Sequence, residues 1–325
     1  MKVRLLAGLF ALGLAATACG GATVNSGSGT TSTAVPQGTA SASGGGTVKI
    51  AINNWVGYEA SAHVVAYLLK NELGYTVELP ELKEEISWQG FESGAVDVII
   101  EDWGHPDLEK KYVEEKKVAQ NIGPTGNKGV IGWYVPKWMA DKYPDITDYK
   151  NLNKYAELFK TSESGDKGQL LDGDPSFVSH DAALVKNLDL NFKVVYSGSE
   201  AALIKAAETA QTQKKALLMY FWQPHWLFSK VELARVNLPP FSQSCDADTK
   251  KVACDYPESD LNKIVSTKFA TTGGKAFELV KNFTWTNEDQ NQVANDITNG
   301  GLSREEAAKK WVEANTAKWQ AWLPK

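Results

Sequence analysis

The chain has 325 residues, of which 43% are hydrophobic and 22% are charged, and its formal net charge is −5. This length allows two packed cores, because domains usually contain about 100–200 residues. The acidic balance argues against a nucleic-acid partner, since neutralising phosphates takes clustered Lys and Arg.

The first 18 residues have the pattern of a secretory signal. Lys2 and Arg4 precede an apolar stretch over 5–16, and Ala16-Thr17-Ala18 supplies the small residues that a signal peptidase reads. Cys19 follows directly, as in a bacterial lipobox, although Ala16 stands where that motif usually has Leu. We therefore predict a lipoprotein signal peptide over 1–18 and a lipid on Cys19. The alternative is a plain secretory signal with Cys19 as an odd thiol.

Residues 20–46 are Gly, Ser, Thr and Ala with five exceptions, and none is charged. Such a segment buries too little apolar surface to offset its ordering entropy, so we expect a flexible tether over 19–46 that spans about 30 Å root-mean-square. A lipid, a tether and a globular body together predict a protein on the extracytoplasmic face of a bacterial cell membrane.

The next segment alternates strands and helices. Strand patterns cover 47–53, 75–79, 96–100 and 129–135, the last of which is cut off by Pro136. Helical patterns cover 59–73, 87–93 and 109–117. Because strands that alternate with helices form parallel sheets, this order predicts a parallel, doubly wound sheet.

The same alternation then begins again. Helices are predicted over 149–160, 177–188 and 199–210, and strands over 192–196, 215–221 and 231–238. The tail is predicted to be helical over 274–282, over 287–299 and onward from the capping box Ser303-x-x-Glu306. Two such units predict an α/β fold with two lobes and a cleft between them.

Tryptophans follow the predicted strands at the edge where α/β sheets bind ligands. Trp55 and Trp103 stand just past the carboxyl ends of strands 47–53 and 96–100. Trp222 holds the matching place after strand 215–221, and Trp133 lies on the strand that leaves the first unit. Together the four indoles predict an aromatic box, although core packing is the alternative for each of them.

An aromatic box suits a quaternary ammonium ion in particular. Such an ion has charge but no N–H, so it is held by cation–π attraction, worth about 0.5–2 kcal/mol per desolvated ring. Sugars also stack on Trp, but they need many polar partners around the ring.

Four motifs carry a resemblance to a known family. They are Asn54-Trp55, Gly94-Ala95-Val96-Asp97-Val98 leading to Asp102-Trp103, Gly132-Trp133-Tyr134-Val135-Pro136, and above all Phe221-Trp222-Gln223-Pro224-His225-Trp226. On these motifs, and over essentially all of 47–325, the chain resembles the substrate-binding proteins of ABC importers for glycine betaine, choline and proline betaine. This resemblance implies a type II periplasmic-binding-protein fold in which 47–132 plus 236–325 form lobe one and 133–235 form lobe two. It also implies a cage for the trimethylammonium group, made by Trp55, Trp103, Trp133 and Trp222.

Some positions depart from this pattern. Val56-Gly57 stands where choline-selective relatives tend to carry an acidic residue, and Phe177 stands where some betaine binders place a Trp. A zwitterionic ligand also needs its carboxylate held, for which His225 and the free N–H groups of the first helix near Gly57 are the candidates. Glycine betaine, choline, carnitine, proline betaine and ergothioneine all stay open as ligands.

The resemblance implies an ABC permease with a separate ATPase subunit as partner, and a monomeric protein without a cofactor. The sequence lacks a Gly-x-Ser-x-Gly elbow, a His-Glu-x-x-His motif and a phosphate loop, so we do not expect an enzyme. A secreted hydrolase and a sugar-binding lectin are the alternatives. Asp102, His105 and Asp107 lie close together, but Pro106 breaks their spacing and we expect no metal site.

Cys245 and Cys254 are nine residues apart in a polar stretch. Outside the cytoplasm an even pair of cysteines at short spacing usually bonds, so we predict a disulfide between them. Two buried free thiols are the alternative.

Overall fold

The structure is a computed structural model that describes residues 45–325. The predicted signal peptide over 1–18, Cys19 and nearly all of the predicted tether therefore lie outside the described residues. Within 45–325, no helix has both the length and the apolar character needed to cross a membrane.

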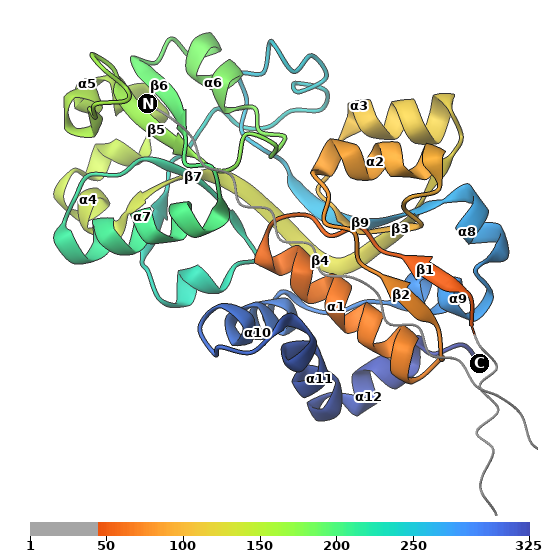
Figure 1. Ribbon diagram of the computed structural model, residues 1–325. Coiled ribbons are helices and arrows are strands. Elements are labelled where there is room, and N and C mark those ends of the chain that lie inside the picture. Colours follow the sequence, from red (N-terminus) through yellow and green to blue (C-terminus); the bar gives the residue numbers. More distant parts are fainter. Residues whose placement is uncertain (1–44) are drawn as a thin grey trace, which may run out of the picture. The chain divides into compact units, whose positions relative to one another are not determined.

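A seven-stranded sheet runs through the described part of the chain, in the order β3-β9-β4-β7-β5-β6, with β8 paired to β4 (Figure 1). Its strands are β3 (Val98–Asp102), β4 (Ala119–Pro136), β5 (Gly168–Asp172), β6 (Phe192–Tyr196), β7 (Met219–Gln223), β8 (Leu233–Arg235) and β9 (Glu258–Ser266). β1 (Thr47–Lys49) and β2 (Thr76–Glu78) form a separate parallel pair, which a bridge from Ile50 to Val98 connects to β3.

The sheet is mixed, so the prediction of a parallel, doubly wound sheet was wrong. β5 pairs in parallel with β6 and β7, but β4 is antiparallel to β7, β8 and β9, and β3 is antiparallel to β9. Antiparallel neighbours need no crossover helix, so the alternation of helices and strands does not reveal them. β5 and β9 were not predicted at all.

β4 is 18 residues long, and the sequence predicted only its second half, 129–135. Its first half contains Gly123, Pro124 and Gly126, which are typical of turns. These residues lie where the register between β4 and β9 shifts, between Asn121 and Lys128. The strand therefore continues through a bulged stretch.

Helices flank the sheet and fall into two groups along the chain, those outside the segment from β4 to β9 and those between β4 and β7. The first group comprises α1 (Val56–Asn71), α2 (Glu84–Ser93), α3 (Pro106–Glu109) with the π-helical turn Lys110–Glu115, α8 (Thr267–Thr272), α9 (Gly274–Asn282), α10 (Asn287–Thr298), α11 (Arg304–Ala314) and α12 (Thr316–Trp319). The second comprises α4 (Lys137–Lys142), α5 (Leu152–Tyr155), α6 (Asp181–Asn187) and α7 (Glu200–Gln213). α10 and α11 pack beside α1 (Figure 1).

Two of the predicted helix starts are confirmed, and two of the predicted helices differ from the structure. The predicted capping box of Ser303 and Glu306 is confirmed at the start of α11, and Ser199 caps α7 as predicted. The helix predicted over 149–160 is instead broken into short helical turns around α5. The helix predicted from Phe177 begins only at Asp181, which leaves Phe177 in a loop.

Cys245 and Cys254 are joined by a disulfide in the segment between β8 and β9. We expect reduction to lower the free energy of unfolding by about 2.5–3 kcal/mol, because the bond closes a short loop in the unfolded chain. Urea unfolding with and without reductant measures this difference, and a Cys245→Ser/Cys254→Ser variant serves as the control that reductant leaves unchanged. Equal stability of the natural protein in both conditions would contradict the expectation.

Candidate functional site

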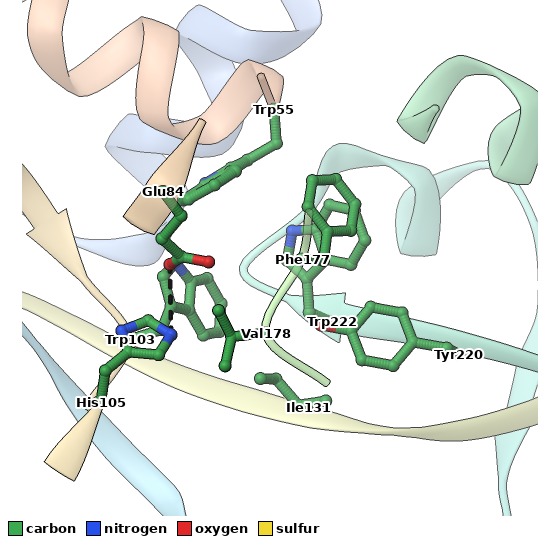
Figure 2. Close-up of a pocket in the computed structure, with 9 residues that line it drawn as sticks. All are labelled: Trp55, Glu84, Trp103, His105, Ile131, Phe177, Val178, Tyr220 and Trp222. Atoms are coloured by element: carbon green, nitrogen blue, oxygen red, sulfur yellow. Dashed lines mark ion pairs between the residues drawn. The ribbon is translucent and has the colours of Figure 1, made fainter. Parts of the chain in front are cut away.

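A mostly aromatic pocket lies beside the carboxyl end of β3 and faces β4 and β7 (Figure 2). It holds about 360 Å³ of empty space, counting its open side. Its lining residues come from six separate segments of the chain, namely Trp55, Glu84, Trp103 with His105, Ile131, Phe177 with Val178, and Tyr220 with Trp222. Four of the predicted site residues, Trp55, Trp103, Phe177 and Trp222, are thus brought together.

One buried carboxylate fixes the two indoles of the first wall. Trp55 Nε1 and Trp103 Nε1 each donate to Oε1 of Glu101 at 3.0 Å. Oε2 of Glu101 accepts from Ser61 Oγ at 3.0 Å and from Gln290 Nε2. Burial raises the pKa of Glu101, and these four hydrogen bonds oppose that rise. An indole that donates a hydrogen bond to a carboxylate gains electron density. The rings of Trp55 and Trp103 therefore attract a cation more strongly.

The backbone around these indoles explains their placement. Trp55 is the extended residue that precedes α1, with φ −136° and ψ 146°, and Trp103 follows directly on β3. Gly129 of β4 lies against the Trp103 ring, where an added Cβ would stand 2.7 Å from Cζ3. The missing side chain of Gly129 therefore lets β4 pass close behind the indole.

The second wall comes from β7 and from the loop before α6. Trp222 lies inside β7, opposite Ile131 of β4, and not after the strand as predicted, because β7 extends to Gln223 before Pro224. Tyr220 lies two residues earlier and lines the same pocket, as the two-residue period of a strand requires. The Phe177 ring stands edge-on between Trp55 and Trp222, with centroids 5.9 and 5.6 Å away.

Three predicted site residues do not line the pocket. Trp133 is fully buried in β4, and its Nε1 donates to Asp181 Oδ1 at 2.8 Å. Gly57 lies in the first turn of α1, where its carbonyl accepts from Gln290 Nε2 at 3.0 Å. His225 lies beside Trp222, with ring centroids 5.7 Å apart, but it faces Glu200.

The surroundings of His225 fix its protonation pattern. Its Nδ1 accepts from the backbone N–H of Leu227 at 3.0 Å, so in the neutral ring Nε2 carries the proton and donates to Glu200 Oε1 at 3.0 Å. The other oxygen of Glu200 accepts from the N–H of Val56, the first residue of α1, at 2.9 Å. Glu200 and His225 are both buried.

A charged cluster completes the pocket. His105 Nε2 lies 3.3 Å from Glu84 Oε1, and His105 Nδ1 lies 2.8 Å from Asp102 Oδ1. Burial lowers the pKa of His105, but the negative charges of Glu84 and Asp102 outweigh it and raise that pKa to about 9. Burial raises the pKa of Glu84, which the charge of His105 opposes. Within the described residues no set of His, Cys, Asp or Glu is arranged to hold a metal ion.

The raised pKa of His105 predicts a pH effect. The stabilisation from charged His105 is fully present below pH 6.5, its ordinary pKa, and is lost as pH rises through about 9. We expect the stability gap between the natural protein and His105→Asn to shrink by about 2–3 kcal/mol from pH 6 to pH 10. Urea unfolding across this range measures the gap, and a gap independent of pH would show that His105 is not charged in the folded protein.

Residues 46–314 match the family described as the substrate binding domain of ABC-type glycine betaine transport systems. The chain belongs to this family. Among similar proteins, a trimethylamine N-oxide-binding protein of Pelagibacter ubique is 23% identical over 294 residues, covering 84% of this chain and 89% of its own. A glycine betaine/carnitine transport binding protein, GbuC of Listeria monocytogenes, is 30% identical over 127 residues, which is 39% of this chain and 38% of its own.

Solved structures show the same fold. Lactococcal OpuAC, in a closed conformation with glycine betaine, superposes with a TM-score of 0.69 at 24% identity, over 86% of this chain and 99% of its own. A choline binding protein in complex with choline superposes with a TM-score of 0.69 at 17% identity, over 85% of this chain and 91% of its own. The predicted α/β fold of a type II periplasmic binding protein is therefore confirmed, as is membership of a family of extracytoplasmic transport proteins.

Proposed function

We propose that this protein captures a small trimethylammonium compound in the pocket and delivers it to an ABC permease driven by a separate ATPase. The observation that carries the proposal is the pair of indoles, Trp55 and Trp103, whose N–H groups are both bound by buried Glu101. Their rings, with Trp222 opposite, surround one space (Figure 2). Several rings around one site suit a ligand that has charge but no N–H.

The relatives support this ligand class. Their names specify trimethylamine N-oxide, glycine betaine with carnitine, and choline, all of which carry a trimethylammonium group. Phe177 is the member of the wall whose ring is weakest in cation–π attraction, and it closes the space between Trp55 and Trp222.

Calorimetric titration with choline, glycine betaine, carnitine and trimethylamine N-oxide tests the proposal. We expect saturable one-to-one binding of at least one of them, and weaker binding of dimethylglycine than of glycine betaine, because dimethylglycine has an N–H that the aromatic wall does not accept. Analysis of the ligand after incubation should detect no product. If none of the four compounds binds, the proposed function is wrong.

The proposal includes a place and a motion. The protein is a monomer, anchored by a lipid on Cys19 after removal of residues 1–18, and the intact mass of the native protein should exceed that of 19–325 by a diacylglyceryl group. A native N-terminus other than Cys19 would overturn the proposed lipid anchor.

The proposed movement is a hinge closure. Lobe two, 133–235, closes on lobe one, 47–132 plus 236–325, and ligand binding favours the closed state.

A further inference from the structure

Two of the groups that could hold a ligand carboxylate, the His225 ring and one N–H at the start of the first helix, already bind a carboxylate of the protein. The Nε2 proton of His225 and the N–H of Val56 both go to Glu200, one to each oxygen. Both side chains are buried, with 4% of His225 and 9% of Glu200 exposed. His225 has no further donor, because its Nδ1 accepts from Leu227.

Among the described residues, the pocket wall carries no free cation that would replace them. Its charged members are Glu84 and His105, and none of the described residues that line it is Lys or Arg. His105 is already shared between Glu84 and Asp102, so two carboxylates face one imidazolium and the cluster has an excess negative charge. A ligand carboxylate there would lose its water, meet Glu84 and find no free cation, which is unfavourable in a buried site.

We propose that the pocket is selective for trimethylammonium cations that lack a carboxylate, with Glu200 occupying the position that a zwitterion's carboxylate would need. This inference rests on the proposed function and narrows its ligand class. Glu84 supplies the negative charge on the pocket side, and the indoles of Trp55 and Trp103 hold the methyl groups.

Choline and glycine betaine form a matched pair for the test. Both carry a trimethylammonium group on a methylene, and they differ in a hydroxymethyl group against a carboxylate. We expect the natural protein to bind choline at least about tenfold more tightly than glycine betaine, since like charges placed together disfavour the wrong ligand. A smaller preference, or a preference for glycine betaine, overturns the inference while leaving the proposed function intact. Failure of every trimethylammonium compound overturns both.

Two variants test the residues themselves. Glu200→Ala frees the N–H of Val56 and the Nε2 proton of His225, and should raise the affinity for glycine betaine relative to choline at least about fivefold. Glu84→Gln removes the negative charge from the pocket wall and should reduce the preference for choline over glycine betaine. Because each ratio compares two ligands on one sample, a partly unfolded variant still gives a valid reading.

The control is Glu208→Gln, which lies on the same helix α7 but pairs with Lys230 at the surface, at 3.0 Å. Its ratio of the two dissociation constants should equal that of the natural protein. If the ratio in Glu200→Ala and in Glu84→Gln also stays at the natural value, neither carboxylate selects the ligand and the inference fails. If Glu200→Ala does not fold, the ratios of the natural protein and of Glu84→Gln decide.

Discussion

Trp222→Ala is expected to weaken the binding of the preferred trimethylammonium ligand by about 10- to 150-fold, and Trp103→Ala by a similar factor. These factors correspond to about 1.5–3 kcal/mol, which combines lost ring contact with lost cation–π attraction. Trp222→Phe should cost less, because a smaller π face remains. Trp222 is the cleaner test, since its indole does not donate to Glu101, whereas that of Trp103 does.

Calorimetry on the folded protein measures these affinities. The matched control is Trp138→Ala on α4, a half-buried Trp outside the pocket whose Nε1 donates to the carbonyl of Ala210 at 3.1 Å. It should bind the ligand as the natural protein does. If both pocket variants fold and keep natural affinity, the indoles serve packing alone and the aromatic cage is wrong.

Glu101→Gln should lower the free energy of unfolding by about 2–4 kcal/mol although it changes the volume of the side chain very little. Glu101 accepts four hydrogen bonds in a buried place, two of them from Trp55 and Trp103. An amide at this position has one oxygen where the carboxylate had two, and its NH₂ group turns a donor toward donors. At least one buried N–H or O–H is then left without a partner. Ligand affinity should fall too, because the indoles lose their common anchor.

Urea unfolding measures the stability of this variant. The control is Glu92→Gln, which removes an exposed ion pair with Lys116 and should stay within about 0.5 kcal/mol of the natural protein. A Glu101→Gln protein as stable as the natural one would mean that the buried network contributes nothing to stability.

The tryptophans that follow predicted strands indicated where the pocket lies. Trp55 and Trp103 were placed correctly because strands 47–53 and 96–100 have a short, clear apolar pattern, and parallel strands present their ends at one edge. Trp222 was found by the same argument, although it lies within β7. Tyr220 was missed, but its signal was present, since it lies two residues before Trp222 in a strand and shares its face.

The parts of the site that the sequence did not predict depend on contacts between residues far apart in the chain. Glu101 was overlooked, although an acidic residue in the apolar run Val-Ile-Ile-Glu-Asp needs buried partners. Those partners, Ser61 and Gln290, are not visible in any local pattern. His225 was expected to hold a ligand because Glu200, 25 residues away, could not be seen as its partner. Periodicity gives the elements, whereas pairing of buried polar groups is decided by tertiary structure.

Gln290 of α10 is the last residue in chain order that supports the pocket, because it donates to Glu101, the anchor of the two indoles. It binds Gly57, Ser61 and Glu101, which precede it by 233, 229 and 189 residues. Contacts that close loops of this length cost entropy before they stabilise anything, so we expect them to form late in folding. Although every residue that lines the pocket precedes 223, a chain cut before α10 would leave the buried carboxylate one donor short. We therefore expect the hydrogen bonds of Glu101, which anchor the two indoles, to be complete only when the C-terminal helices have docked.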